Sequence, residues 1–141
     1  MVRLIFLLLL LMPVMGQGSD LVVVANPKSG AESLSREQVV NIFLGRFRQF
    51  PSGLTAEPLD LPATERAYFY RKLVGKDLAE INAYWARLIF SGRTLPPEPL
   101  KSEAAVVHRV ASTPGAIGYV SRAAVDKRVR IVFELGSHVS P

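Results

Sequence analysis

The sequence of 141 residues contains no cysteine and only two histidines, His108 and His138. Without cysteine the chain can form neither a disulfide nor a thiolate metal site. The two histidines lie far apart in the sequence and lack the spacing of metal ligands, so a zinc site is not predicted either. We therefore expect no metal and no cofactor.

Sequence motifs of common enzymes are also missing. No Gly-x-Ser-x-Gly motif occurs, and the serines lie in predicted caps and loops. The segment "NPKSGAES" superficially resembles a phosphate loop, but it does not match Gly-x-x-x-x-Gly-Lys-Ser/Thr. No local spacing indicates a pair of catalytic carboxylates. The sequence therefore predicts a protein that is not an enzyme and has no catalytic residues.

Positive charge is present but is not concentrated. The formal net charge is +5, and the densest basic piece is only "GRFRQF", residues 45–50. Nucleic-acid proteins usually show basic clusters or a recognised module, so no nucleic-acid partner is expected. A mild positive balance is compatible with a small anionic ligand, with an anionic envelope surface, or with no particular partner.

The first residues have the pattern of a secretory signal peptide. Arg3 precedes the apolar run "LIFLLLLLM", Leu4 to Met12, and small residues follow near Gly16. The run is about ten residues long, whereas a membrane-spanning helix needs about 20, so a membrane anchor is the weaker interpretation. We expect a signal peptide over residues 1–16, cleavage after Gly16 or in the region Gln17 to Gly18, and one domain over residues 17–141.

The rest of the chain alternates between strand and helix patterns, which indicates an α/β domain with a mixed sheet flanked by helices. Capping boxes at Ser35/Gln38 and Asp77/Glu80 predict two helix starts. Thr64 and Ser102 are expected to cap two further helices. The predicted strands are Leu21 to Ala25, buried on both faces; Ala56 to Leu61; "AIGYVS", residues 116–121; and Val129 to Leu135.

Several residues carry more specific expectations. Pro58 should make its strand an edge strand or a bent one. Gly115 should end the preceding helix in the left-handed conformation. Trp85 and Phe90 should pack the longest helix against the sheet. The Tyr119 hydroxyl should point toward a cleft or toward water.

Two places have the features of an anion site, which needs unpaired backbone N–H groups at a helix start and a nearby cation. One is the loop Lys28-Ser29-Gly30, which could also be a flexible turn. The other is "PATER", where Thr64 lies at a helix start and Arg66 in its first turn. Thr64 could equally be a plain N-cap, and Arg66 a surface charge or a member of an ion pair that lines the core.

Four segments, in the same order, resemble the solute-binding proteins of phosphate ABC transporters, which have the type 2 periplasmic binding fold. They are "SLSREQVVNIFLGRFRQFPSG", "ERAYFYRKLVG", "AYWARLIFSG" and "TPGAIGYV". The resemblance runs from about Leu21 to Val132. It implies a periplasmic location, phosphate or another small anion as ligand, and an ABC permease as partner. Gly118 would then lie near the cleft and allow close approach of a ligand or a neighbouring element, or would only relieve helix–strand packing.

The chain departs from this family in two ways. It matches only one of the two lobes that close around the ligand, so we expect a single-lobe relative. Where the family has Ser-Gly-Thr, often followed by Arg, this sequence has Pro62-Ala63-Thr64-Glu65-Arg66. We therefore expect weak oxyanion recognition, with a second copy or an envelope protein supplying the other wall. The alternative is an envelope interaction module that kept the fold without the pocket.

Overall fold

A computed structural model describes residues 20–136, so the predicted signal peptide and His138 lie outside the described residues. In this range the strands are β1 (Leu21–Ala25), β2 (Glu57–Asp60), β3 (Glu98–Pro99), β4 (Ala116–Ser121) and β5 (Arg130–Glu134). The α-helices are α1 (Arg36–Phe43), α2 (Ala63–Val74), α3 (Leu78–Phe90) and α4 (Glu103–Ser112), and two short 3-10 turns are η1 (Pro27–Ser29) and η2 (Arg122–Ala124). None of these helices combines the length and the hydropathy needed to cross a bilayer.

The strands form one mixed sheet in the order β3-β2-β4-β1-β5. β2 runs parallel to both β3 and β4, whereas β1 runs antiparallel to β4 and β5. This confirms the predicted α/β class. Val24 pairs with Gly118 across β1 and β4, and Ile117 pairs with Pro58 across β4 and β2. The register fixes which ends of the strands share an edge of the sheet.

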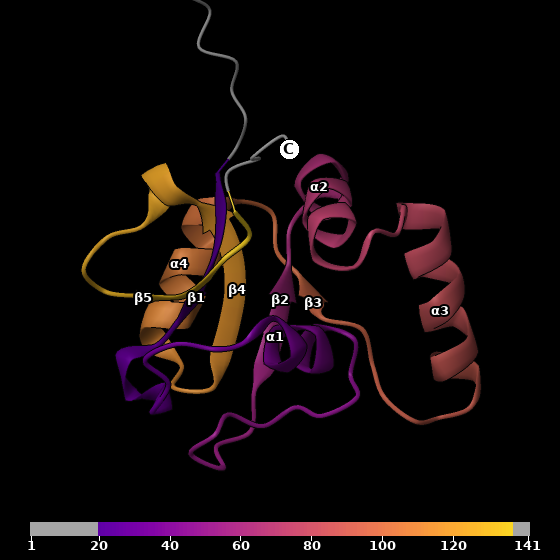
Figure 1. Cartoon of the computed structure of the whole chain (residues 1–141), viewed down its shortest axis with the longest axis horizontal. Coiled ribbons are helices and arrows are strands. Elements are labelled where there is room, and N and C mark those ends of the chain that lie inside the picture. The colour runs from indigo at the N-terminus through magenta and orange to yellow at the C-terminus, as the bar shows by residue number, and fades with distance from the viewer. Residues whose placement is uncertain (1–19, 137–141) are drawn as a thin grey trace, which may run out of the picture.

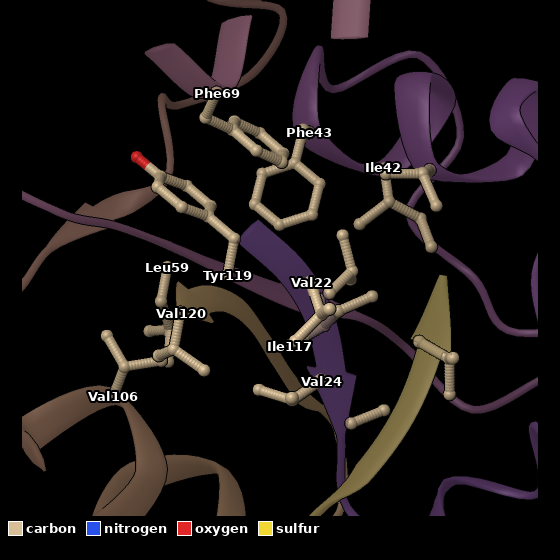
Figure 2. Packing of buried hydrophobic residues seen from close by; sticks show 14 of the residues in the cluster. Val22, Val24, Ile42, Phe43, Leu59, Phe69, Val106, Ile117, Tyr119 and Val120 are labelled. Carbon is tan, nitrogen blue, oxygen red and sulfur yellow. The ribbon is translucent and has the colours of Figure 1, made fainter. Parts of the chain in front are cut away.

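Helices cover both faces of the sheet, which explains the unbroken apolar run of β1 (Figure 1). Phe43 of α1 and Phe69 of α2 pack against Tyr119 on one face of β4. Val106 of α4 lies on the opposite face (Figure 2). Every residue of β1 is therefore buried, as the sequence predicted. α3 packs on the outside of α2 and does not reach the sheet centre.

Helix starts follow the predicted local chemistry at three of four places. Both capping boxes form, at Ser35/Gln38 and at Asp77/Glu80, and the Ser102 side chain accepts a bond from the Ala105 amide. These bonds satisfy backbone donors of the first turn that the helix itself leaves open.

Gly118 is required by the packing of α4 against β4. A Cβ placed on Gly118 would lie 2.5 Å from Val106 Cγ1 and 3.6 Å from Leu59 Cβ. Real Cβ contacts are never this short, so a larger residue must push the helix away from the sheet. Of the two expectations for Gly118, relief of helix–strand packing is the one that the structure shows.

We expect Gly118→Ala to lower the free energy of unfolding by about 1–3 kcal/mol, the usual cost of overpacking a core. Urea titration followed by circular dichroism measures this change. Val106→Ala removes the clashing methyl group, so the double variant should lose less stability than the sum of the two single losses. Strict additivity would show that Val106 is not what excludes a side chain at position 118.

Three predictions from the sequence fail in whole or in part because tertiary packing decides them. Of the two alternatives for Pro58, the edge strand is wrong, because β2 lies between β3 and β4; β3 pairs only with Leu59 and Asp60, so Pro58 lies just outside that pairing. Gly115 has no positive φ; instead its Cα approaches the Thr55 carbonyl oxygen so closely that a Cβ would lie 2.5 Å from it. Phe90 is 95% exposed and does not pack on the sheet, although Trp85 is buried.

Candidate functional site

The start of α2 follows the C-terminal end of β2. Pro62 occupies the N-cap position, and it makes no side-chain hydrogen bond to the first turn. Thr64 is already helical and exposed, so the prediction that it caps α2 is wrong. The physical reason is that a cap needs extended backbone, which Pro62 has at φ −59° and ψ 167°. The first-turn amides of α2 therefore have no side-chain acceptor from the N-cap.

A buried carboxylate lies beside this helix start. Asp60, the last residue of β2, is 3% exposed. Its Oδ1 accepts hydrogen bonds of 3.0 Å from the hydroxyls of Tyr70 and Tyr119, and its Oδ2 lies 3.2 Å from Arg66 Nε. The Tyr119 hydroxyl also accepts a 3.0 Å bond from the Leu61 amide. The Tyr119 hydroxyl thus points neither to a cleft nor to water.

Burial governs the protonation of these groups. It raises the pKa of Asp60, while the Arg66 guanidinium and the two phenol hydroxyls act in the opposite direction. Burial and the Asp60 charge together raise the pKa of Tyr70 and that of Tyr119. Both tyrosines consequently keep their protons and remain donors to the carboxylate.

Arg66 is held in a fixed orientation rather than displayed to solvent. Its Nε bonds Asp60 and its Nη1 donates to Asn82 Oδ1 at 3.0 Å, while the guanidinium carbon lies 5.7 Å from the centre of the Tyr70 ring. Within residues 20–136, Nη2 has no hydrogen-bond acceptor on the protein, and the side chain keeps 19% of its surface exposed. Of the expectations for Arg66, the ion pair that lines the core is the one the structure contains.

The loop Lys28-Ser29-Gly30 and the start of α2 lie at opposite ends of the strands (Figure 1). This follows from the register, because β1 runs antiparallel to β4 whereas β2 runs parallel to it. The structure therefore does not bring the two predicted anion sites together. A single small ion cannot contact both.

At the loop itself, the three residues have different environments. Lys28 lines a groove of about 230 Å³ with Asn26, Ser112 and Arg128. The Ser29 hydroxyl is buried and accepts a bond from the Ala31 amide at 3.2 Å, so it faces inward. Gly30 has φ 80°, and a Cβ there would lie 2.8 Å from Ser52 Cβ. The groove adjoins the last turn of α4, where Asn26 Nδ2 donates to the Val110 carbonyl at 2.8 Å.

Sequence reasoning missed Asp60, Tyr70 and Asn82, which together hold Arg66. One signal was available for Asp60: a charged residue ends an apolar strand directly before a helix and six residues before an arginine. Asn82 carried no such signal, because α3 meets α2 only through tertiary folding. Among the described residues, no group of three acidic, histidine or cysteine side chains could hold a metal ion.

Known structures share this arrangement of strands and helices. A phosphate transport receptor of the ABC type from Vibrio cholerae matches with a TM-score of 0.62 and 18% identity, over 80% of this chain and 45% of its own. This is the fold of one lobe of a phosphate-binding transport receptor. A putative phosphate ABC transporter substrate-binding protein with bound phosphate, from Clostridium perfringens, matches with a TM-score of 0.61 and 16% identity, over 80% and 44%.

A third structure, PstS from Borrelia burgdorferi, matches with a TM-score of 0.55 and 14% identity, over 81% of this chain and 46% of that one. The chain thus spans less than half of the length of each of these receptors. No family model and no curated protein matches the sequence. The predicted resemblance to phosphate receptors is confirmed at the level of the fold.

Proposed function

We propose that this chain is an exported, periplasmic, non-catalytic solute-binding lobe that recognises phosphate or a related oxyanion weakly at the start of α2. The observation that carries the proposal is the uncapped first turn of α2 beside a guanidinium held in place by Asp60 and Asn82. Helix starts of this kind favour anions through their free N–H groups and the helix dipole. The exposed Thr64 hydroxyl and Arg66 Nη2 would add two side-chain donors.

Weak binding follows from the charges around this helix start. Asp60 already compensates Arg66, and Glu65 adds a negative charge in the first turn. A carboxylate a few ångströms from an anion repels it by about 1–4 kcal/mol in a partly solvated site. A second copy of the chain, an ABC permease or another envelope protein would supply the missing wall and exclude water.

Isothermal titration calorimetry with phosphate and with sulfate at millimolar concentration tests this proposal. We expect heat with at least one anion, and Thr64→Val should weaken binding about fivefold, because a hydroxyl hydrogen bond contributes about 1 kcal/mol. Thr64 is exposed, so this change should leave the fold intact. Arg71→Ala, at an exposed arginine in the last turn of α2, is the control away from the helix start. Lys28→Ala tests the loop Lys28-Ser29-Gly30, and a loss only there would move the site to the opposite end of the strands.

The raised pKa of Asp60 predicts how sulfate binding depends on pH. Protonation of Asp60 would leave the Arg66 charge uncompensated, so affinity for sulfate should increase as pH falls toward the pKa of Asp60. Sulfate is the suitable probe because it keeps both charges over this range. Asp60→Asn should abolish this dependence. Affinity that is independent of pH in the wild-type chain would place the anion away from Arg66.

The second candidate function is an envelope interaction module without a ligand pocket. The observation that favours it is that the Asp60 carboxylate already engages the guanidinium that the ligand would need. Absence of heat with either anion at millimolar concentration would contradict anion binding and support this alternative. Sedimentation velocity of the same samples would show whether a second copy binds.

A further inference from the structure

Among the described residues, the large hydrophobic side chains that are exposed lie in two segments that contain no acidic residue. Between residues 20 and 136, the large hydrophobic side chains that are exposed are Phe47 (58%), Leu54 (38%), Ile89 (51%), Phe90 (95%) and Leu95 (68%). All of them fall in residues 38–56 or 81–97, and neither stretch contains Asp or Glu. Isolated exposed hydrophobic residues need no explanation, but a set confined to acid-free segments does.

The two segments meet in space along the C-terminal half of α3. The Arg48 side chain donates to Thr94 Oγ1 at 3.1 Å, and the Tyr84 hydroxyl donates to the Leu44 carbonyl at 2.7 Å. A groove of about 240 Å³ lies between them, with Arg46 and Arg87 in its wall. We define the arginine–aromatic face by the exposed residues Arg46, Phe47, Arg87, Ile89, Phe90, Arg93 and Leu95.

The charges of this face are uncompensated. Within the described chain, Arg46, Arg87 and Arg93 form no ion pair, whereas Arg66, Arg109, Arg122 and Arg128 do. Glu80 also lines this groove, and it pairs with Lys76 at 3.5 Å. The face therefore combines apolar side chains with three positive charges and fits an occupant that is both negative and apolar.

We propose that the arginine–aromatic face binds the surface of an anionic phospholipid bilayer. Phe47 is exposed in the loop after α1, Phe90 at the last residue of α3, and Leu95 in the loop that follows α3. A protein partner would need a separate pocket for each protruding side chain, whereas lipid chains close around them without a preformed shape. The exposed, unpaired arginines supply the positive charge that attracts basic segments to anionic lipid surfaces. The proposal does not depend on the proposed anion site at α2.

The single tryptophan gives a readout close to this face. Trp85 is buried in α3, two residues before Arg87 and five before Phe90, with the Arg48 guanidinium 5.7 Å from the ring centre. The experiment mixes the full chain with vesicles of equal phosphatidylglycerol and phosphatidylcholine, in which the acyl chains carry bromine. Bromine quenches tryptophan only at short range. We expect Trp85 to be quenched with the mixed vesicles and not with pure phosphatidylcholine vesicles.

Variants connect the quenching to the residues of the face. Arg46→Ala with Arg87→Ala should weaken vesicle binding by tenfold or more, given about 1 kcal/mol for each basic residue near the surface. Arg71→Ala with Lys101→Ala removes the same charge from exposed positions elsewhere and should have little effect. Phe90→Ser should reduce the quenching without unfolding the chain, because Phe90 is almost fully exposed.

Three outcomes would overturn the proposal. Vesicle binding without quenching of Trp85 would mean that another part of the chain, such as the apolar run at residues 4–12, binds the lipid. Equal losses of vesicle binding in the two double variants would show that binding depends on net charge and not on this face. Absence of binding to both vesicle types would contradict lipid binding and favour a protein partner at this face.

Discussion

Phe69→Ala should lower the free energy of unfolding by about 3–5 kcal/mol, the range for deleting a large buried aromatic ring. Phe69 is completely buried, and its ring stacks on that of Tyr119 with centroids 3.8 Å apart and an interplanar angle of 4° (Figure 2). Phe43 and Tyr70 contact it edge-on at 4.9 and 5.0 Å. Since the ring joins α1, α2 and β4, its loss leaves a cavity that no single element can fill. Equilibrium unfolding in urea measures the change.

The chain contains a matched control for this prediction. Phe90→Ala removes the same ring from a site that is 95% exposed, so stability should change by no more than about 0.5 kcal/mol. Similar losses in the two variants would mean that the Phe69 ring is not enclosed as described. The Phe69→Ala protein should still form its helices, because the capping boxes of α1 and α3 do not involve this residue.

Asp60→Ala should also lower the free energy of unfolding by about 3–5 kcal/mol, because breaking a buried ion pair leaves the partner charge buried and unpaired. The substitution leaves the Arg66 guanidinium without its counter-ion and the Tyr70 and Tyr119 hydroxyls without their acceptor. Unpaired buried hydroxyls add to the loss. Urea unfolding at neutral pH checks the magnitude. Glu98→Ala breaks the exposed pair with Arg109 and should cost far less, because solvent screens that pair.

The pH dependence of the same group has a definite sign. Burial raises the pKa of Asp60 above its ordinary value of 3.8, so the folded chain holds this proton more tightly than the unfolded chain. Stability from Asp60 therefore decreases as pH rises from the ordinary pKa through the raised one. The stability of the wild-type chain relative to Asp60→Asn should fall over this window. A relative stability that rises with pH would mean that Arg66 and the two hydroxyls outweigh burial.

Features decided by neighbouring residues could be predicted from the sequence. Ser35 with Gln38 and Asp77 with Glu80 form capping boxes because the partners lie three residues apart. The apolar run Leu21–Ala25 indicated a strand buried on both faces, which requires helices on both sides of the sheet. The fold class followed from these patterns and from the order of the elements.

Features decided by distant residues could not be predicted. Thr64 has the side chain of a cap, but the strand ends at Asp60 and Pro62 takes the cap position, two residues before Thr64. Arg66 was recognised as a candidate, but its partners Asp60 and Asn82 come from β2 and α3. Phe90 continues an apolar pattern, yet α3 extends beyond the surface that it covers. A local pattern shows that a side chain is suited to burial and does not show what covers it.

The two ends of the described chain lie next to each other. Leu135 donates its amide to the Leu21 carbonyl at 3.4 Å, and Arg122 links Asp20 with Glu134. A domain built this way can be spliced into a surface loop of a host protein, because entry and exit are separated by about one strand spacing. Both ends lie at the C-terminal end of β4, because Leu21 pairs with Ser121 and Glu134 with Val22.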